Sequence, residues 1–167
     1  MHELIINHNG IIQQPILLDD IVWNTERKGQ PGKLAFSVLN DGSLKVDEGD
    51  HVSFRVDKED VFYGFVFKRS WSKDKIISIT AYDQLRYLKN KDTYKYENKT
   101  ATELIKMIAD DFNLNLGTLE NTGYKIEKRV EDGETLFDII LNALDLTLQN
   151  KKKMYVLYDD YGKLTLK

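Results

Sequence analysis

The chain has 167 residues, of which 41% are hydrophobic and 31% charged, a composition typical of folded globular proteins and not of disordered ones. It contains no cysteine, which excludes disulfides, thiolate metal ligands and cysteine nucleophiles. The 24 basic and 27 acidic side chains leave no surplus for neutralising phosphates, so we expect no specific nucleic-acid binding. No run of about 18 apolar residues occurs, and we expect no membrane span.

Short strands account for the first 83 residues. Residues 3–7 and 11–12 flank Asn9 and Gly10, a pair typical of a two-residue hairpin turn. Alternating, aromatic or β-branched runs predict further strands at 16–26, 33–39, 51–56, 61–71 and 76–82. Their short, even spacing predicts a small antiparallel β-barrel or sandwich over residues 1–83.

One face of these strands should form a core, because apolar residues recur there at every second position. The residues predicted to line it, unless their alternate-face neighbours do, are Leu34, Phe36, Val38, Val52, Phe54, Ile77 and Ile79. The strand at 61–71 is apolar on both faces, which is typical of a strand covered on two sides. Its second face, with Tyr63, Phe65 and Phe67, is therefore either a second core layer or a protein interface. Gly64 marks a bulge or a close backbone approach.

After Asp83 the sequence predicts helices as well as strands. Residues 84–97 predict a connecting helical turn and strand. Thr100 and Glu103 then form a capping-box pattern, which predicts the start of a helix, and Gly117 is a plausible stop. The apolar face of this helix consists of Leu104, Ile105, Ile108 and Phe112.

A second helix is predicted over about residues 134–148, with an apolar stripe of Phe137, Ile140, Leu141, Leu144 and Leu148. Residues 155–158 and 164–166 predict a closing hairpin. We expect the faces of Phe112 and Phe137 to pack toward each other and toward this hairpin. The fold class is therefore α+β: an antiparallel β-barrel at 1–83, the connecting turn and strand at 84–97, and a small two-helix α/β domain at 98–167. We expect that domain to be truncated at its C-terminal end.

No catalytic, cofactor-binding or metal site is predicted, and we expect the chain not to be an enzyme. His2, His8 and His51 lack a second ligand at metal-binding spacing, so we expect them on the surface or at turns. The acidic segment 41–50 lacks the register of a calcium loop. Paired carboxylates lie at predicted turns or helix ends, where solvated charge is expected in place of acid–base catalysis. These pairs are Asp19-Asp20, Glu59-Asp60, Asp110-Asp111 and Asp159-Asp160.

Two features suggest phosphate or nucleic-acid binding, and neither pattern is complete. Residues 29–32 lack the Gly-Lys-Ser/Thr ending of a phosphate-binding loop and precede a strand. Lysines between residues 89 and 99 alternate with Tyr87, Tyr94 and Tyr96, as in single-strand binders, but carboxylates dilute the charge. A small β-barrel module that binds oligosaccharide or single-stranded nucleic acid therefore remains the alternative function.

Several runs carry a resemblance that covers essentially the whole chain. They are residues 27–39 (RKGQPGKLAFSVL), 48–54 (EGDHVSF), 62–67 (FYGFVF), 79–94 (ITAYDQLRYLKNKDTY), 98–105 (NKTATELI) and 155–160 (YVLYDD). Together they resemble the XkdQ/YqbQ group, baseplate hub proteins of contractile phage tails and of defective-prophage particles. Members of this group are similar to the trimeric hubs of larger contractile phages and to the base of type VI secretion spikes.

The resemblance implies a structural role in a contractile injection system. Hubs of this group join the tail tube to the central spike, and their barrels resemble the tube subunit. The implied partners are further copies of the chain in a trimer, the tail tube protein, the spike and other baseplate proteins. The implied location is the baseplate of a virion or phage-tail-like particle assembled in the bacterial cytoplasm. Two barrels per chain would let a trimer match a hexameric tube, and only one is evident here.

Overall fold

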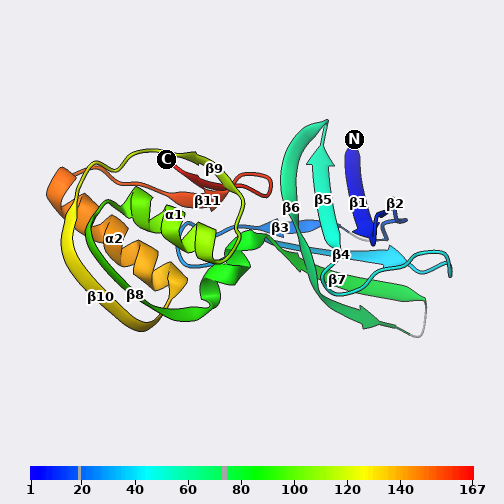
Figure 1. Cartoon of the computed structure of the whole chain (residues 1–167). Coiled ribbons are helices and arrows are strands. Elements are labelled where there is room, and N and C mark those ends of the chain that lie inside the picture. Colours follow the sequence, from blue (N-terminus) through cyan, green and yellow to red (C-terminus); the bar gives the residue numbers. More distant parts are fainter. Residues whose placement is uncertain (19, 73–74) are drawn as a thin grey trace. The chain divides into compact units, whose positions relative to one another are not determined.

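The computed structural model describes residues 1–18, 20–72 and 75–167 and divides them into two compact units (Figure 1). Unit 1 comprises Met1–Thr25 and Pro31–Asp83, and unit 2 comprises Glu26–Gln30 and Gln84–Lys167. The chain therefore passes from one unit to the other after residues 25, 30 and 83. The five residues 26–30 lie inside the range in which we expected only the first domain.

Unit 1 is a seven-stranded antiparallel sheet. Its strands are β1 (His2–His8), β2 (Ile11–Gln13), β3 (Val22–Asn24), β4 (Lys33–Leu39), β5 (His51–Val56), β6 (Glu59–Trp71) and β7 (Ile76–Tyr82). They are ordered β2-β1-β5-β6-β7-β4-β3, so β2 and β3 are the two edges. Among the described residues no pairing joins these edges, and a closed barrel is therefore not confirmed.

The first hairpin forms as predicted. His8 pairs with Ile11, which leaves Asn9 and Gly10 as a two-residue loop. Their φ values of 50° and 86° are both positive, as a type I′ turn requires. This turn matches the right-handed twist of the strands, and it fixes the register of β2 on β1.

The predicted core of unit 1 is confirmed. All seven residues predicted for it are buried, and Leu4, Ile6, Phe62 and Val66 join them. Gly64 lies where a Cβ would come within 2.3 Å of the Tyr82 carbonyl oxygen, so the close-approach interpretation is correct. The second face of β6 differs from the first, because Tyr63 and Phe65 are only partly buried and Phe67 is 51% exposed.

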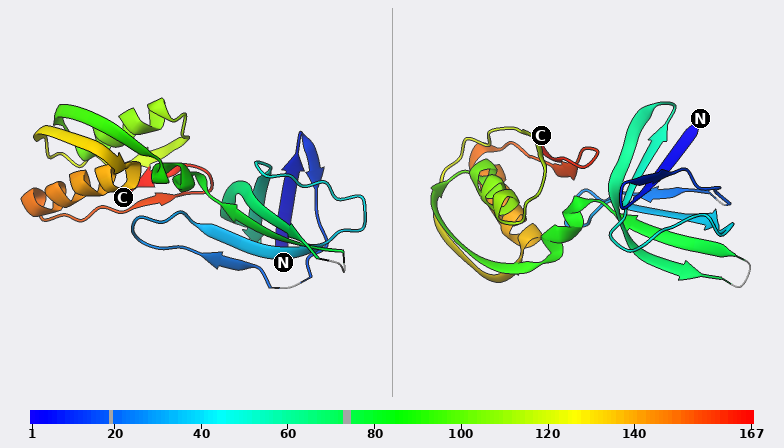
Figure 2. Two further views of the ribbon diagram at one scale, coloured as in Figure 1. Left: turned by 90° about the horizontal axis from the view of Figure 1, so that it is seen from below. Right: turned by 45° about the vertical axis from the view of Figure 1, so that its right-hand side comes forward.

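Unit 2 combines two helices with two small sheets (Figure 2). Its elements are a 3-10 helix (Gln84–Lys89), β8 (Lys91–Lys99), α1 (Ala101–Asp111), β9 (Leu116–Leu119), β10 (Ile126–Thr135), α2 (Leu136–Lys151), β11 (Leu157–Asp159) and β12 (Leu164–Leu166). Strands β8 and β10 form a long antiparallel ribbon against which both helices pack. Strand β12 pairs antiparallel with β11 and parallel with β9. The α+β class is confirmed.

Helix α1 begins at the predicted capping box. The Thr100 hydroxyl accepts a hydrogen bond from the Glu103 backbone N–H, and the Glu103 carboxylate accepts one from the Thr100 backbone N–H. The predicted stop at Gly117 is wrong, because the helix ends at Asp111 and Asn113 takes a left-handed φ of 52°. Gly117 instead lies in β9, where a Cβ would come within 2.6 Å of the Thr165 hydroxyl oxygen.

One hydrophobic core holds unit 2 together. Phe137 is buried in it together with residues of α1 and β12, and Phe112 packs against it, as predicted. The predicted stripe of α2 is correct for Phe137, Ile140 and Leu144 and wrong for Leu148, which is exposed, while Leu141 is only partly buried. Ile139 and Ala143 are buried in addition, so the buried face is turned relative to the predicted stripe. Among the described residues, no helix combines the length and the apolar character needed to cross a bilayer.

Candidate functional site

The described residues contain no cluster of three or more histidine or acidic side chains able to hold a metal ion. The sequence predicted that none of the three histidines has a partner at metal-binding spacing. In unit 1, His8 and His51 each have a polar partner, although not a metal site. The Nδ1 atom of His51 lies 2.8 Å from the Tyr63 hydroxyl oxygen, and the imidazole also packs against Phe65 with ring centroids 4.7 Å apart. His2 is exposed and contacts the edge of the Phe54 ring.

His8 lies directly before the Asn9-Gly10 turn, as expected, but its side chain has a partner that the sequence did not indicate. Its side chain is only 13% exposed, and its Nδ1 lies 2.9 Å from a carboxylate oxygen of Asp50, itself buried. Asp50 also accepts a hydrogen bond from the Asp47 backbone N–H at 2.6 Å, and Asp47 forms an ion pair with Arg69 at 2.6 Å. The pairing of β1 with β5 creates this network across 42 residues of sequence, and it braces the loop before β5.

The carboxylate pairs do not gather into one site. Asp60 forms an ion pair with Arg55, and Asp111 accepts a hydrogen bond from the Tyr94 hydroxyl. Asp20 is exposed, and Asp19 lies outside the described residues. No pair faces a second carboxylate across a cleft in the described part of the chain, and nothing in their arrangement resembles an acid–base centre.

Asp159 is the exception to the expected solvation. Burial raises the pKa of its carboxyl group above the usual range, and the pKa is held down in part by hydrogen bonds from the Gly162 backbone N–H and the Gln84 side-chain amide. Gln84 in turn accepts a hydrogen bond from the Asn115 backbone N–H at 2.9 Å. Asp159 therefore ties the closing hairpin to the 3-10 helix and has a structural role.

The tyrosines among the lysines of residues 89–99 point the wrong way for binding bases. Tyr94 and Tyr96 are buried, and burial raises the pKa of both hydroxyls. Lys95 and Glu97, which alternate with them on β8, are exposed. Single-strand binders stack bases on exposed rings. The structure therefore removes two of the three rings that favoured nucleic-acid binding, and Tyr87 alone of the three is exposed.

The loop at residues 29–32 does not cradle a phosphate. The Gly32 backbone N–H donates to the Asp83 carboxylate at 2.8 Å, so this amide is already bound to an anion within the chain. Gly29 has a φ of 69°, which lets the chain turn back toward β4. The loop reverses the chain direction. Its residues 29 and 30 belong to unit 2, and residues 31 and 32 belong to unit 1.

What unit 1 does present is apolar side chains on both edges of its sheet. Ile12 on β2 is 64% exposed and Trp23 on β3 is 50% exposed, and Ile11 and Val22 beside them are exposed as well. Native proteins usually protect sheet edges with charge, proline or a covering segment. We call these four residues the apolar edges, and they are the candidate interaction site of unit 1.

An aromatic row crosses the outer face of the same sheet. The register places His51 opposite Phe65, and Phe65 opposite Tyr82, so three neighbouring strands contribute one ring each. Phe67 packs edge-on against Tyr82 with ring centroids 5.5 Å apart. The rings are tilted or perpendicular and do not form a flat platform for a sugar ring. This geometry is better suited to protein side chains.

The chain is similar in sequence to a known protein family and to two proteins of Bacillus subtilis. Residues 21–167 match the model of a family described as YQBQ-like. Over 124 residues the chain is 42% identical to the uncharacterized protein YqbQ and 40% identical to the phage-like element PBSX protein XkdQ, both of Bacillus subtilis strain 168. Each alignment covers 73% of this chain, and the chain spans 38% of the length of these curated relatives.

A solved structure shares the fold. The crystal structure of the 43 kDa tail protein of prophage MuSo2 from Shewanella oneidensis superimposes with a TM-score of 0.79 at 17% sequence identity. The match covers 99% of this chain and 53% of that one. Both the seven-stranded unit and the two-helix unit thus occur together in a second protein.

Proposed function

The chain belongs to the YqbQ-like family, and from that premise we propose that it is a structural component of a phage tail or phage-tail-like particle, specifically of the baseplate hub that joins the tail tube to the central spike. Its relatives XkdQ, named as a protein of a phage-like element, and the MuSo2 tail protein support a tail role. In this proposal the chain is not an enzyme, and it acts by assembling with other copies and with other tail proteins.

The apolar edges are the single observation that carries the proposal. A closed ring needs each subunit to present two complementary lateral surfaces. An open sheet with exposed apolar side chains on both edge strands offers such surfaces, because a neighbour can add its own strand to either edge. We propose that the seven-stranded sheet is the tail-tube-like barrel of a hub, with β2 and β3 facing neighbouring barrels.

The proposed partners follow from this arrangement. The complete gene product would form a trimer, contact the tail tube and the spike, and reside in the baseplate. Only one barrel-like sheet occurs among the described residues, so this chain alone offers about half of the lateral surface of a ring matched to a six-membered tube. We therefore expect the isolated chain to be monomeric.

Light scattering coupled to size exclusion tests the proposal. The complete gene product is expected to have the mass of a trimer, and the paired substitutions Ile12→Lys and Trp23→Lys, which place charge on both apolar edges, are expected to reduce it to a monomer. Val130→Lys, at an exposed apolar position of unit 2, is the matched control and should leave the trimer intact. A monomeric gene product would contradict the hub assignment. A stable trimer of the isolated chain would overturn the two-barrel argument.

A further inference from the structure

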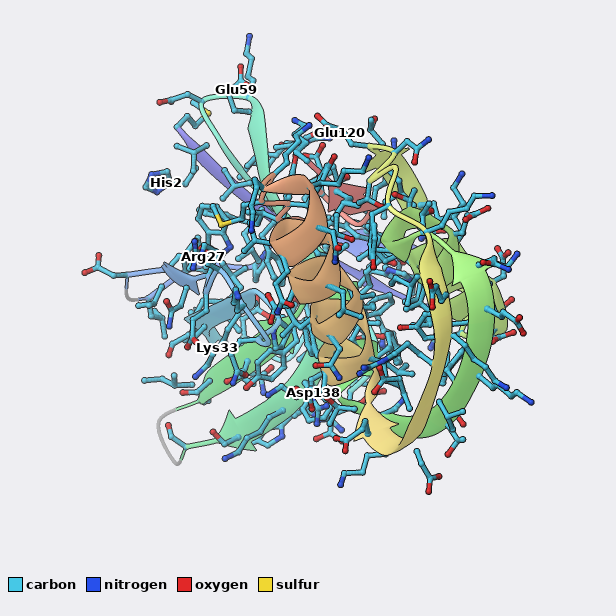
Figure 3. The ribbon with its side chains drawn as sticks, turned by 90° about the vertical axis from the view of Figure 1, so that its left-hand side faces the viewer. His2, Arg27, Lys33, Glu59, Glu120 and Asp138 are labelled. Atoms are coloured by element: carbon cyan, nitrogen blue, oxygen red, sulfur yellow. The ribbon has the colours of Figure 1, made fainter. Side chains whose placement is uncertain are left out.

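A groove in unit 2 has no part in the proposed hub assembly. One wall is formed by α2, and the other is the segment from Met154 to Leu157 that leads into β11. Leu148 is 37% exposed and Met154 53% exposed on its rim, so apolar surface is left open to solvent. Figure 3 views α2 from this side of the molecule and shows Arg27 beside it. We call this feature the α2 groove.

The size of the α2 groove argues against a small-molecule ligand. Its cavity measures about 40 Å³, whereas ligand pockets begin at roughly 300 Å³. A space of this size accepts part of one apolar side chain. Leu141 and Leu144 line its wall on α2 and Phe137 and Tyr155 also line it, so the surface that such a side chain would meet is apolar.

The charges on the rim are unequal. Lys28 forms an ion pair with Asp145 at 3.5 Å, which neutralises the one carboxylate that lines the groove. Arg27 donates a hydrogen bond to the Met154 sulfur at 3.5 Å, a weak acceptor, and within the described residues it has no carboxylate partner. Its guanidinium is therefore an available two-pronged donor beside an apolar surface.

The end of α2 adds further positive charge. Lys151 lies three residues after Leu148, which places it one helical turn further along the same side. Lys151 and Lys152 are exposed, and neither forms an ion pair with a carboxylate among the residues described. The surface around the groove is thus apolar at its centre and basic at its rim.

We propose that the α2 groove binds a segment of another protein that carries a bulky aliphatic side chain next to a carboxylate. The aliphatic side chain enters between α2 and Met154, and the carboxylate binds Arg27. Charge complementarity selects this occupant, since a basic segment would be repelled by Arg27 and the lysines that end α2. This inference does not rest on the proposed function, because it concerns unit 2 and the hub proposal rests on the edges of unit 1.

A random peptide library displayed on filamentous phage is the probe, with the chain as bait. The enriched peptides are expected to combine leucine, isoleucine or methionine with a nearby aspartate or glutamate. Fluorescence anisotropy on synthetic copies of these peptides then measures affinity. Arg27→Glu is expected to weaken binding about tenfold or more, and Leu148→Gln by a similar factor. Lys106→Glu, the same charge reversal at an exposed position of α1, is the control and should leave affinity unchanged.

Circular dichroism melts establish that each variant folds, and Arg27→Gln, which removes the positive charge and shortens the side chain but keeps it polar, serves as the second variant if Leu148→Gln unfolds. Enrichment of no peptide, enrichment of peptides without acidic residues, or equal binding by the wild type and both groove variants would overturn the proposal. Self-association of the chain that disappears in Arg27→Glu would also overturn it, because the occupant would then be a second copy.

Discussion

Two residues, Gly64 and Asp159, have roles that the hydrophobic pattern of the sequence does not reveal. Gly64 is required on β6 because the Tyr82 carbonyl of the neighbouring strand occupies the place of a side chain. Asp159 is a partly buried carboxylate of unit 2 that accepts hydrogen bonds from the Gln84 side chain and the Gly162 backbone N–H. Each depends on contacts between distant parts of the chain, and each leads to a measurement.

Replacing Gly64 with alanine should destabilise unit 1. The added Cβ would lie 2.3 Å from the Tyr82 carbonyl oxygen and 2.6 Å from the Phe62 ring, so strands β6 and β7 must separate. Such overpacking typically costs about 1–3 kcal/mol, measurable by urea denaturation. Gly133→Asn is the control, because no atom lies within 4 Å of the site and asparagine tolerates its φ of 64°. Equal stability of the two variants would disprove the close approach.

Asp159 should make stability depend on pH. Its pKa is raised by burial in the folded protein above its ordinary value of 3.8, so the folded state binds this proton more tightly than the unfolded state. The stabilisation from that proton is fully present below about pH 4 and is lost as pH rises through the folded pKa. The unfolding free energy of the wild type should therefore fall relative to that of Asp159→Asn over this window.

Urea denaturation of both proteins between about pH 4 and pH 7 measures the difference. Glu134→Gln, at an exposed position of β10, is the control and should follow the wild type. A constant gap between wild type and Asp159→Asn across the window would show that Asp159 ionises as it does in the unfolded chain.

At the scale of elements, local signals predicted the helices and most strands. Helix α1 was predictable because its capping box and apolar face are encoded within a few residues. Strand β10 was not, because its alternation is inverted: Val130 is 59% exposed and Glu131 is buried. Glu131 is tolerated inside because Arg129 and the Asn142 amide donate to it. Because this charged residue faces the core, the alternation of apolar and polar residues does not reveal the strand.

The candidate site was predictable only in part. Aromatic residues on both faces of the strand at 61–71 suggested an interface or a second layer, and the open second face of β6 favours the interface. The apolar edges were not foreseen, because the sequence contains no information on which strands lie last in the sheet. The His8–Asp50 pair was missed for the same reason, since strand order brings its partners together.

The contribution of α2 to unit 2 can be measured by truncating its buried side. Phe137→Ala should lower the unfolding free energy by about 3–5 kcal/mol, because the ring is buried in the core between the helices. Leu148→Ala on the same helix is the control and should cost much less, since its side chain is already partly exposed. If both variants melt at the same temperature, Phe137 is not part of the core.

At the scale of the whole molecule, the two units differ in the surface that they offer. Unit 1 carries exposed apolar side chains on both edges of an open sheet, which supports lateral assembly. Unit 2 carries a small apolar groove with a basic rim, which suits a single peptide segment. Neither surface brings together the groups of a catalytic centre in the described residues.

The most direct test of the structural role is quantitative mass spectrometry of purified tail particles from a bacterium that carries this gene. The proposal predicts peptides from the chain in intact particles at a stoichiometry of one trimer per particle, retained through washing with concentrated salt. Particles that contain their tube and sheath proteins but no peptide of this chain would contradict the account.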